Sequence, residues 1–220
     1  MIRLFIIDGL NIFKNNQDGI VISKLDFNLV NQKFPIKIDY DFSSALAIGE
    51  HNQENFAIVH SVLDSLSLLE GFNFQNFINT FEPSPYRIQK IRAIENCVFY
   101  NDGKSTNLDS TLAALKSLDV DKGLLILGGK IRDRSIEFEK LNPYKDNYHI
   151  FAFGEAKDYI KESLEHEFSV KAFDDLNDLF KEIVIGDFSV VLFSPCFPSF
   201  DLYKNYIERA EHFNSLVSEL

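Results

Sequence analysis

Two polar loops in this chain each follow a short apolar run and precede a helix-like segment. The first loop is Asn101-Asp102-Gly103-Lys104-Ser105-Thr106-Asn107, and the second is Ser194-Pro195-Cys196-Phe197-Pro198-Ser199-Phe200-Asp201. The carboxyl end of a strand that meets the amino end of a helix is where α/β proteins bind anions, because free backbone N–H groups and the helix dipole both point there. The predicted chemistry of both loops is therefore recognition of phosphate or carboxylate groups.

The first loop contains the Gly-Lys-Ser triplet of a phosphate-binding P-loop, but the rest of that motif is absent. A P-loop needs a second glycine five residues earlier, so that the backbone can curl around the phosphates, and position 98 is Val. The simplest alternative is an ordinary helix start capped by Thr106 or Asn107.

Strands and helices alternate from residue 97 onward. This pattern predicts a doubly wound, mostly parallel α/β sheet, because right-handed crossovers join successive parallel strands. The expected strands are 97–101, 123–128, 148–153, 169–172 and 189–193, and the expected helices are 106–117, 136–141, 155–164, 175–184 and 200–217.

The first part of the chain has a different pattern. Short strands at 2–7 and 20–22, followed by others up to about residue 48, predict a small antiparallel patch. A helix is expected from Gly49 to a stop at Gly71, and a shorter one from Phe74 to Phe81. The prolines that follow favour two domains, 1–94 and 95–220, of which the first looks incomplete.

Composition limits the possible partners. A net charge of −11 and a pI near 4.9 argue against nucleic acid or an anionic membrane, both of which need clustered Lys and Arg. Cys97 and Cys196 stand in apolar contexts without zinc-ligand spacing, so we expect both to be buried packing residues. No apolar run approaches the roughly 20 residues of a membrane helix, and the expected location is the cytoplasm.

Taken in order, these motifs resemble the C-terminal part of the Mur ligase family. The first loop is similar to the family's Asp-x-Lys-x-Thr-Asn motif, and the second is similar to its Ser-bearing loop near the C-terminus. Gly49-Glu50-His51-Asn52 resembles a Gly-x-His-Asn segment, and Arg87 matches an interdomain His-Arg pair in which Tyr86 here replaces the His. The resemblance extends over most of the chain, loosely before residue 95 and mainly by position before residue 45.

The resemblance implies a role for each matching residue. The expected nucleotide-binding residues are Asn52, Arg87, Asp102 and Lys104, with Lys104 also catalytic. The expected D-glutamate-binding residues are Thr106, Arg132, Ser199, Phe200 and Tyr206. The cation that pairs with a substrate carboxylate could be Lys130, Arg132 or Arg134, and we favour Arg132 from its offset to Gly128-Gly129; a surface loop with incidental charge remains the alternative.

The resemblance also implies an activity, an ATP- and Mg²⁺-dependent joining of D-glutamate to UDP-N-acetylmuramoyl-L-alanine in peptidoglycan synthesis. Residues 1–94 would be a remnant of the central ATPase domain, and 95–220 the Rossmann-like amino-acid-binding domain. The chain lacks a Gly-x-x-Gly-Lys-Thr segment, so we expect it to be about half of such an enzyme, inactive alone, and the full enzyme to be a monomer. The alternatives are a related ligase for another amino acid, a non-catalytic amino-acid-binding module, and an architectural domain with a dead site.

Overall fold

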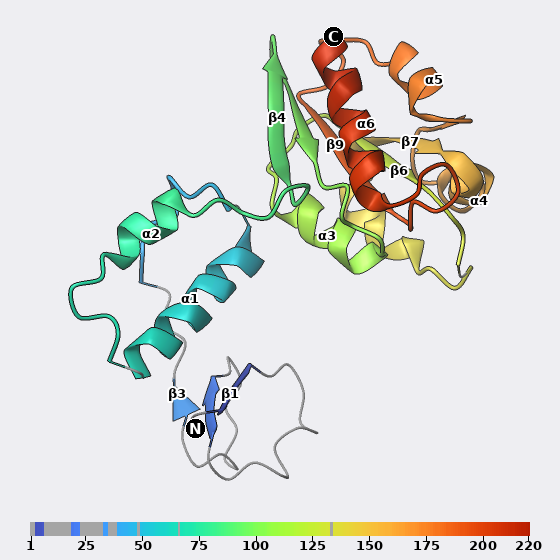
Figure 1. Ribbon diagram of the computed structural model, residues 1–220. Coiled ribbons are helices and arrows are strands. Elements are labelled where there is room, and N and C mark those ends of the chain that lie inside the picture. The colour runs from blue at the N-terminus through green and yellow to red at the C-terminus, as the bar shows by residue number, and fades with distance from the viewer. Residues whose placement is uncertain are drawn as a thin grey trace. The chain divides into compact units, whose positions relative to one another are not determined.

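The structure, a computed structural model, describes residues 3–6, 19–22, 33–34, 39–47, 49–65, 67–132 and 134–220. The chain forms two compact units, Met1–Glu82 and Pro83–Leu220 (Figure 1). The expected division at 94/95 falls within the second unit, because β4 (Gln89–Ile94) is paired with β5 (Cys97–Asn101) in an antiparallel hairpin.

A three-stranded sheet in the first unit is parallel. Its strands are β1 (Arg3–Ile6), β2 (Gly19–Ile22) and β3 (Lys33–Phe34), in the order β1-β2-β3. The predicted antiparallel patch is therefore wrong. Twelve residues separate β1 from β2 and ten separate β2 from β3, many more than the about two residues that a tight antiparallel hairpin needs. The connecting stretches 7–18 and 23–32 lie outside the described residues.

Two helices complete the first unit. α1 (Glu50–Ser65) begins directly after Gly49 and ends before the predicted stop at Gly71, and α2 (Phe74–Thr80) is capped by the Asn73 side chain, which accepts a hydrogen bond from the Asn76 N–H. Aromatic and aliphatic side chains join these helices, and the buried members of this cluster are Ala47, Phe56, Phe74 and Ile78. The burial of this apolar face stabilises the helix pair.

The second unit contains a six-stranded sheet in the order β4-β5-β9-β6-β7-β8. All neighbouring strands are parallel except β4, which is antiparallel to β5. The predicted doubly wound, mostly parallel fold is thus confirmed. Its other strands are β6 (Gly123–Gly128), β7 (Tyr148–Phe153), β8 (Val170–Phe173) and β9 (Val190–Cys196).

Helices cover both faces of this sheet. α5 (Leu176–Lys181) and α6 (Tyr206–Glu219) pack on one face, whereas α3 (Leu108–Lys116) contacts β9 and α4 (Lys157–Leu164) contacts β6, β7 and β8 from the other. The helix predicted over 136–141 is a 3-10 helix, and the helix predicted to begin at residue 200 begins at Tyr206, where the Asn205 side chain caps it by accepting from the Glu208 N–H. The same unit contains the 3-10 helices η2 (Phe138–Tyr144) and η3 (Gly154–Ala156).

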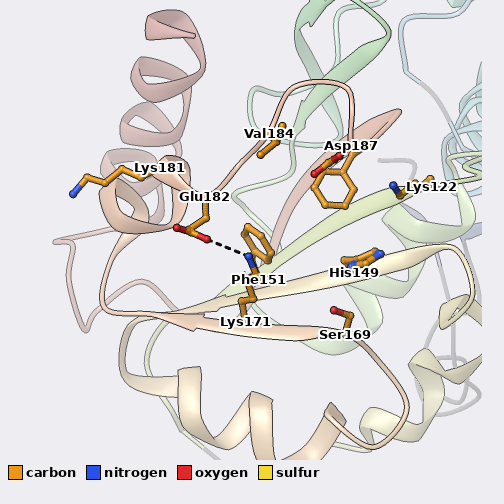
Figure 2. Close-up of a pocket in the computed structure, with 10 residues that line it drawn as sticks. Lys122, His149, Phe151, Ser169, Lys171, Lys181, Glu182, Val184 and Asp187 are labelled. Atoms are coloured by element: carbon orange, nitrogen blue, oxygen red, sulfur yellow. Dashed lines mark hydrogen bonds and ion pairs between the residues drawn. The ribbon is translucent and has the colours of Figure 1, made fainter.

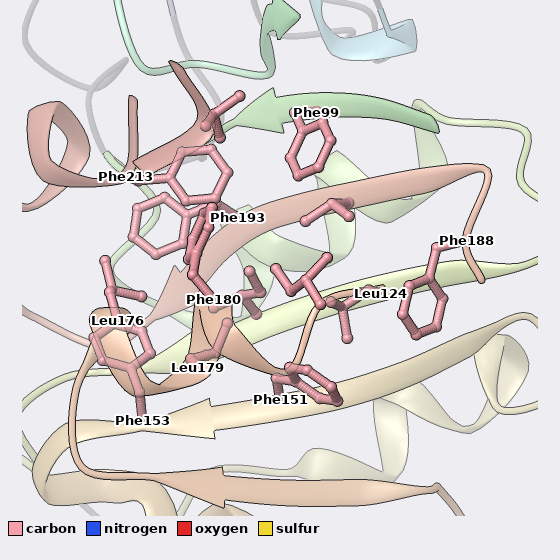
Figure 3. Packing of buried hydrophobic residues seen from close by; sticks show 14 of the residues in the cluster. Phe99, Leu124, Phe151, Phe153, Leu176, Leu179, Phe180, Phe188, Phe193 and Phe213 are labelled. Carbon is pink, nitrogen blue, oxygen red and sulfur yellow. The ribbon is translucent and has the colours of Figure 1, made fainter. Parts of the chain in front are cut away.

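The core between the sheet and the α5–α6 face is rich in phenylalanine (Figure 3). Phe193 of β9 and Phe213 of α6 are fully buried, and their rings are stacked with centroids 4.5 Å apart. Burial of a large apolar side chain contributes roughly 1.5–3 kcal/mol, and aromatic pairs add to this. This contact fixes α6 against the central strand of the sheet.

The β4 edge of the sheet is polar. Its strand carries Lys90 and Arg92, and the pairing with β5 is shifted between these two residues by a bulge or similar irregularity. Among the described residues, no helix is both long enough and apolar enough to span a membrane.

We expect Phe213→Ala to lower the free energy of unfolding of the chain by about 3–5 kcal/mol, because it removes a buried ring and leaves a cavity. Leu202→Ala is the control, since the Leu202 side chain is 48% exposed and its loss should change stability little. Urea unfolding followed by circular dichroism measures both. Equal effects of the two substitutions would contradict the packing described for Phe213.

Candidate functional site

The position of β9 brings the predicted site loops together. β9 lies between β5 and β6 and is parallel to both, so that Phe193 pairs with Asn101 on one side and Ile126 on the other. The carboxyl ends of parallel strands meet at one edge of a sheet, which is where open α/β sheets bind ligands. The loops after Asn101, Gly128 and Cys196 therefore lie side by side.

The Asp102 side chain is turned inward. It is 4% exposed and accepts hydrogen bonds from the hydroxyls of Ser105 and Ser194, the latter at 2.7 Å, and from the Ile88 N–H at 3.2 Å. In this structure the carboxylate joins the β5, β9 and β4 segments. Its expected contact with a nucleotide stays a prediction.

Burial raises the pKa of the Asp102 carboxyl to about 6, because the charged form loses its hydration. Hydrogen bonds from Ser105, Ser194 and Ile88, and the positive charge of Arg87, act in the opposite direction and limit the rise. The carboxyl is thus mostly ionised at neutral pH but is poised to take up a proton in mild acid.

The segment around Arg87 is held in an unusual backbone conformation. Tyr86 and Ile88 both have positive φ angles, 63° and 47°, which side chains other than glycine adopt rarely. The Tyr86 carbonyl accepts a hydrogen bond from the Lys104 N–H at 3.2 Å. This bond, together with the bond from the Ile88 N–H to Asp102, holds the exposed Arg87 beside the Asp102–Lys104 loop. That loop is one part of the predicted nucleotide site.

The Lys104 side chain lies near the Tyr206 ring. Its Nζ is 5.9 Å from the centroid of the Tyr206 ring, which also makes an edge-on contact with the Tyr86 ring at 6.5 Å between centroids. Thr106 is exposed, and the next residue, Asn107, caps α3 by accepting from the Ser110 N–H. The helix-start interpretation of this loop therefore holds for Asn107, and the substrate role of Thr106 stays a prediction.

Gly129 allows the β6 loop to approach the β9 loop. It has a φ of +134°, and a side chain at this position would overlap the Pro198 carbonyl oxygen and would lie 2.9 Å from Nη1 of Arg209. The next residue, Lys130, donates its N–H to the Pro198 carbonyl at 2.7 Å. Gly129 thus permits the backbones of the two loops to approach each other closely.

Of the three candidate cations of this loop, Lys130 is exposed, and the two arginines lie against different rings. The Arg132 guanidinium lies 5.9 Å from the Phe200 ring centroid, in the loop that carries Ser199. The Arg134 guanidinium lies 5.3 Å from the centroid of the Tyr159 ring of α4. The backbone carbonyl of Arg134 accepts a hydrogen bond from the Tyr159 hydroxyl. Of these two arginines, Arg132 is the one in contact with the predicted substrate loop.

Ser199 and Phe200 differ in exposure. Ser199 is 2% exposed and its carbonyl accepts a hydrogen bond from the Tyr203 N–H, whereas the Phe200 side chain is 54% exposed. The Ser199 hydroxyl makes no hydrogen bond to a described residue. Ser199 thus directly precedes an exposed ring that lies against the Arg132 guanidinium.

Arg209 is a functional candidate that the sequence patterns did not single out. It is fully buried in the first turn of α6 and donates hydrogen bonds to three backbone carbonyls, those of Gly103, Gly128 and Phe197. Burial lowers the pKa of its guanidinium to about 10, so the group stays charged at neutral pH. A signal was present in the sequence: Arg209 lies three residues after Tyr206 and four before Phe213, on the core stripe of its helix.

Asp201 joins the β9 loop to the loop after β7. Its Oδ2 accepts a hydrogen bond from the Glu155 N–H at 3.1 Å, while its Oδ1 is buried without a partner among the described residues. The Ala156 N–H also donates to the Gly129 carbonyl at 3.0 Å. Four strand ends are thus connected by hydrogen bonds along one edge of the sheet.

The remaining expectations concern Asn52, the cysteines and metal ligands. Asn52 lies in the first turn of α1, in the first unit. Cys97 and Cys196 are buried free thiols, as predicted, and burial raises the pKa of the Cys196 thiol to about 12. The described part of the chain holds no group of three or more His, Cys, Asp or Glu side chains that could bind a metal ion, and the Mg²⁺ requirement stays an expectation from the resemblance.

A pocket of about 420 Å³ lies toward the amino ends of the strands, away from the carboxyl ends that carry the predicted site (Figure 2). Of the lining residues, Lys122 and Ser169 directly precede β6 and β8, and Phe188 lies two residues before β9. Two of its lysines are in ion pairs, Lys171 with Glu182 at 3.1 Å and Lys181 with Asp178 at 2.8 Å. None of the predicted site residues lines this pocket.

Comparison with known proteins supports a family relationship. No family model matches the chain. The chain is 33% identical over 175 residues to the UDP-N-acetylmuramoylalanine--D-glutamate ligase of Hydrogenobaculum sp. (strain Y04AAS1). The aligned region covers 78% of this chain and 41% of that protein. The ligase of the same name from Francisella tularensis subsp. novicida (strain U112) is 29% identical over 185 residues, or 82% of this chain and 44% of that one.

Solved structures show the same fold at lower identity. A UDP-N-acetylmuramate-alanine ligase from Thermotoga maritima has a TM-score of 0.57 and 15% identity, and covers 79% of this chain and 39% of that one. A Mycobacterium tuberculosis folylpolyglutamate synthase complexed with ADP has a TM-score of 0.53 and 14% identity over 78% of this chain and 41% of that one. The chain is a homologue of the Mur ligases. Among them it matches the D-glutamate ligases, of whose length it spans about two fifths.

We expect the Asp102 carboxyl to make stability fall as pH rises. The folded carboxyl holds its proton to a higher pH than the unfolded one, so the stability that it contributes is fully present below about pH 4 and is lost as the pH rises through about 6. The lost contribution is about 3 kcal/mol, since each unit of pKa difference corresponds to about 1.4 kcal/mol.

The measurement is urea unfolding of the unmodified chain and of Asp102→Asn between pH 4 and 7.5. The free energy of unfolding of Asp102→Asn should rise relative to that of the unmodified chain as the pH rises, because an amide cannot ionise. A difference that is constant with pH, or that grows in favour of the unmodified chain, would contradict the raised pKa.

We expect Gly129→Ala to destabilise the chain by about 3 kcal/mol or more, because the new methyl group overlaps the Pro198 carbonyl in addition to the backbone strain. Gly186→Ala is the matched control. Gly186 also has a positive φ of 99°, but nothing lies within 4 Å of an added methyl group, so only the strain of about 1–2 kcal/mol should appear. Thermal unfolding of both variants measures the difference, and equal losses would show that Gly129 is needed for its φ angle alone.

Proposed function

We propose that the chain is the amino-acid-binding part of an ATP-dependent ligase that joins D-glutamate to UDP-N-acetylmuramoyl-L-alanine. The observation that carries this proposal is the arrangement of Arg132, Ser199 and Phe200 at the carboxyl edge of the sheet. A guanidinium and a hydroxyl together suit a carboxylate, which accepts charge-assisted hydrogen bonds. The relatives named as D-glutamate ligases support this choice of amino acid.

The proposed reaction forms an amide bond through an acyl phosphate. The γ-phosphoryl group of ATP passes to the carboxylate of UDP-N-acetylmuramoyl-L-alanine, and ADP leaves. The amine of D-glutamate then attacks the acyl carbon, gives a tetrahedral intermediate, and loses a proton as inorganic phosphate departs. The barrier is lowered by positioning the two substrates and by stabilising phosphate charge.

The residues of this chain divide between the two substrates in that scheme. Ser199 and Arg132 hold a carboxylate of D-glutamate, with Phe200, Thr106 and Tyr206 beside it. Lys104 and Arg87 face the phosphates, and Asp102 keeps their two loops together through its bonds to Ser105 and Ile88. Asn52 would contact the adenine, and Mg²⁺ would neutralise phosphate charge when bound.

The test is an NMR titration of the chain with D-glutamate, with L-glutamate as the control ligand. Shifts of the Ser199 and Gly129 amides with the D enantiomer alone are expected, and Ser199→Ala should weaken binding about 10-fold or more, because one hydrogen bond to a charged group contributes roughly 1.5–3 kcal/mol. Ser215→Ala, which removes an exposed hydroxyl of α6, is the matched control and should leave the affinity unchanged.

Two further variants test the choice of cation. Arg132→Gln should weaken D-glutamate binding at least as much as Ser199→Ala, while Arg134→Gln should have little effect, because Arg134 is held against Tyr159. Selective response to another amino acid would favour a related ligase or a non-catalytic binding module. No response to any amino acid would contradict the proposed site in this chain.

A further inference from the structure

The Arg209 side chain stands out because it is a buried charge that makes no direct ion pair with a described residue; the nearby Asp201 charge acts on it only from beyond contact distance. It is fully buried, and no carboxylate of a described residue lies within ion-pair distance of it. Burial of a charge is costly unless hydrogen bonds compensate for the lost hydration. Here the compensation comes from backbone carbonyls.

The three accepting carbonyls belong to three different strand ends. Nη1 donates to the Phe197 carbonyl at 2.8 Å and to the Gly128 carbonyl at 3.2 Å, and Nη2 donates to the Gly103 carbonyl at 3.1 Å. Gly103 follows β5, Gly128 ends β6 and Phe197 follows β9. One planar group thus fixes the mutual spacing of the three loops that carry the proposed site.

The neighbouring residues are also built around this guanidinium. A side chain at Gly129 would lie 2.9 Å from its Nη1, and one at Gly103 would lie 2.7 Å from Cβ of Ala210, the next residue of α6. Its Cζ lies 6.0 Å from the centroid of the Phe193 ring. The loops therefore approach the first turn of α6 closely enough that its arginine reaches all three of them.

We propose that Arg209 is the positioning residue of the site: through its bonds to Gly103, Gly128 and Phe197 it sets the distance between Lys104, Arg132 and Ser199. The inference rests on the proposed function for its ligand, but the coupling of the three loops is independent of the ligand. Arginine suits this role because its donors lie in one rigid plane, whereas a lysine ammonium is a point donor on a flexible stem. Lys at position 209 would keep the charge but would not hold all three carbonyls in one geometry.

The test compares Arg209→Lys with a matched control, Arg92→Lys. Arg92 also donates to two backbone carbonyls, those of Val217 and Ser218, but it is exposed and lies at the other end of α6. For each variant, amide hydrogen exchange of the three loops, D-glutamate affinity by NMR titration, and global stability by urea unfolding are measured on the full chain. Arg209→Met, which removes every donor, is a second variant that extends the series where it folds.

The expected result for Arg209→Lys is coordinated loosening of the three loops. Exchange of amides near Gly103, Gly129 and Ser199 should accelerate by a common factor of about 10 or more, exchange in the centre of β6 should not change, and D-glutamate affinity should fall at least 10-fold. Arg92→Lys should leave all of these quantities unchanged.

Two results would overturn the proposal: unchanged loop exchange in Arg209→Lys, or acceleration throughout the sheet in proportion to a loss of global stability. If the unmodified chain does not bind D-glutamate, the proposed function fails, and the loop exchange still decides whether Arg209 couples the strand ends.

Discussion

The insertion of the last strand between the first and second strands of the parallel series is the constraint on which the site depends. β9 is hydrogen-bonded to β5 and β6 along its length. Segments about a hundred residues apart in the sequence therefore end at the same edge. Any shift of this register would move the second loop away from both its neighbours, and no local interaction within a loop could restore the arrangement.

Buried polar groups hold the loops together at this edge of the sheet. Their surroundings both destabilise and stabilise the charges that they carry. Desolvation destabilises the charge of Asp102, while two hydroxyls and a backbone N–H stabilise it. Asn101 is likewise buried and donates to the Ala210 carbonyl of α6. Such groups specify one arrangement of loops more strongly than they stabilise the fold, since each misplaced partner leaves an unsatisfied polar atom.

The sequence predicted the central strands well and the polar connections poorly. β5, β6 and β7 have the predicted bounds, because strands buried on both faces are short, continuous apolar runs. No strand is predicted at β4, because a half-exposed edge strand with Lys90 and Arg92 lacks that pattern. The predicted loops do meet at one edge, but the sequence could not reveal that Asp102 points inward or that Gly129 packs on Pro198, because both depend on contacts between distant segments.

The shift in the pairing of β4 has a consequence for self-association. An exposed edge strand offers unpaired backbone groups to any other extended chain, and edge charges and bulges are devices that prevent such pairing. A second copy adding to β4 would have to bury Lys90 or Arg92 against its own backbone and would lose register at the irregularity between them. This edge therefore disfavours the addition of a further strand on the β4 side of the sheet.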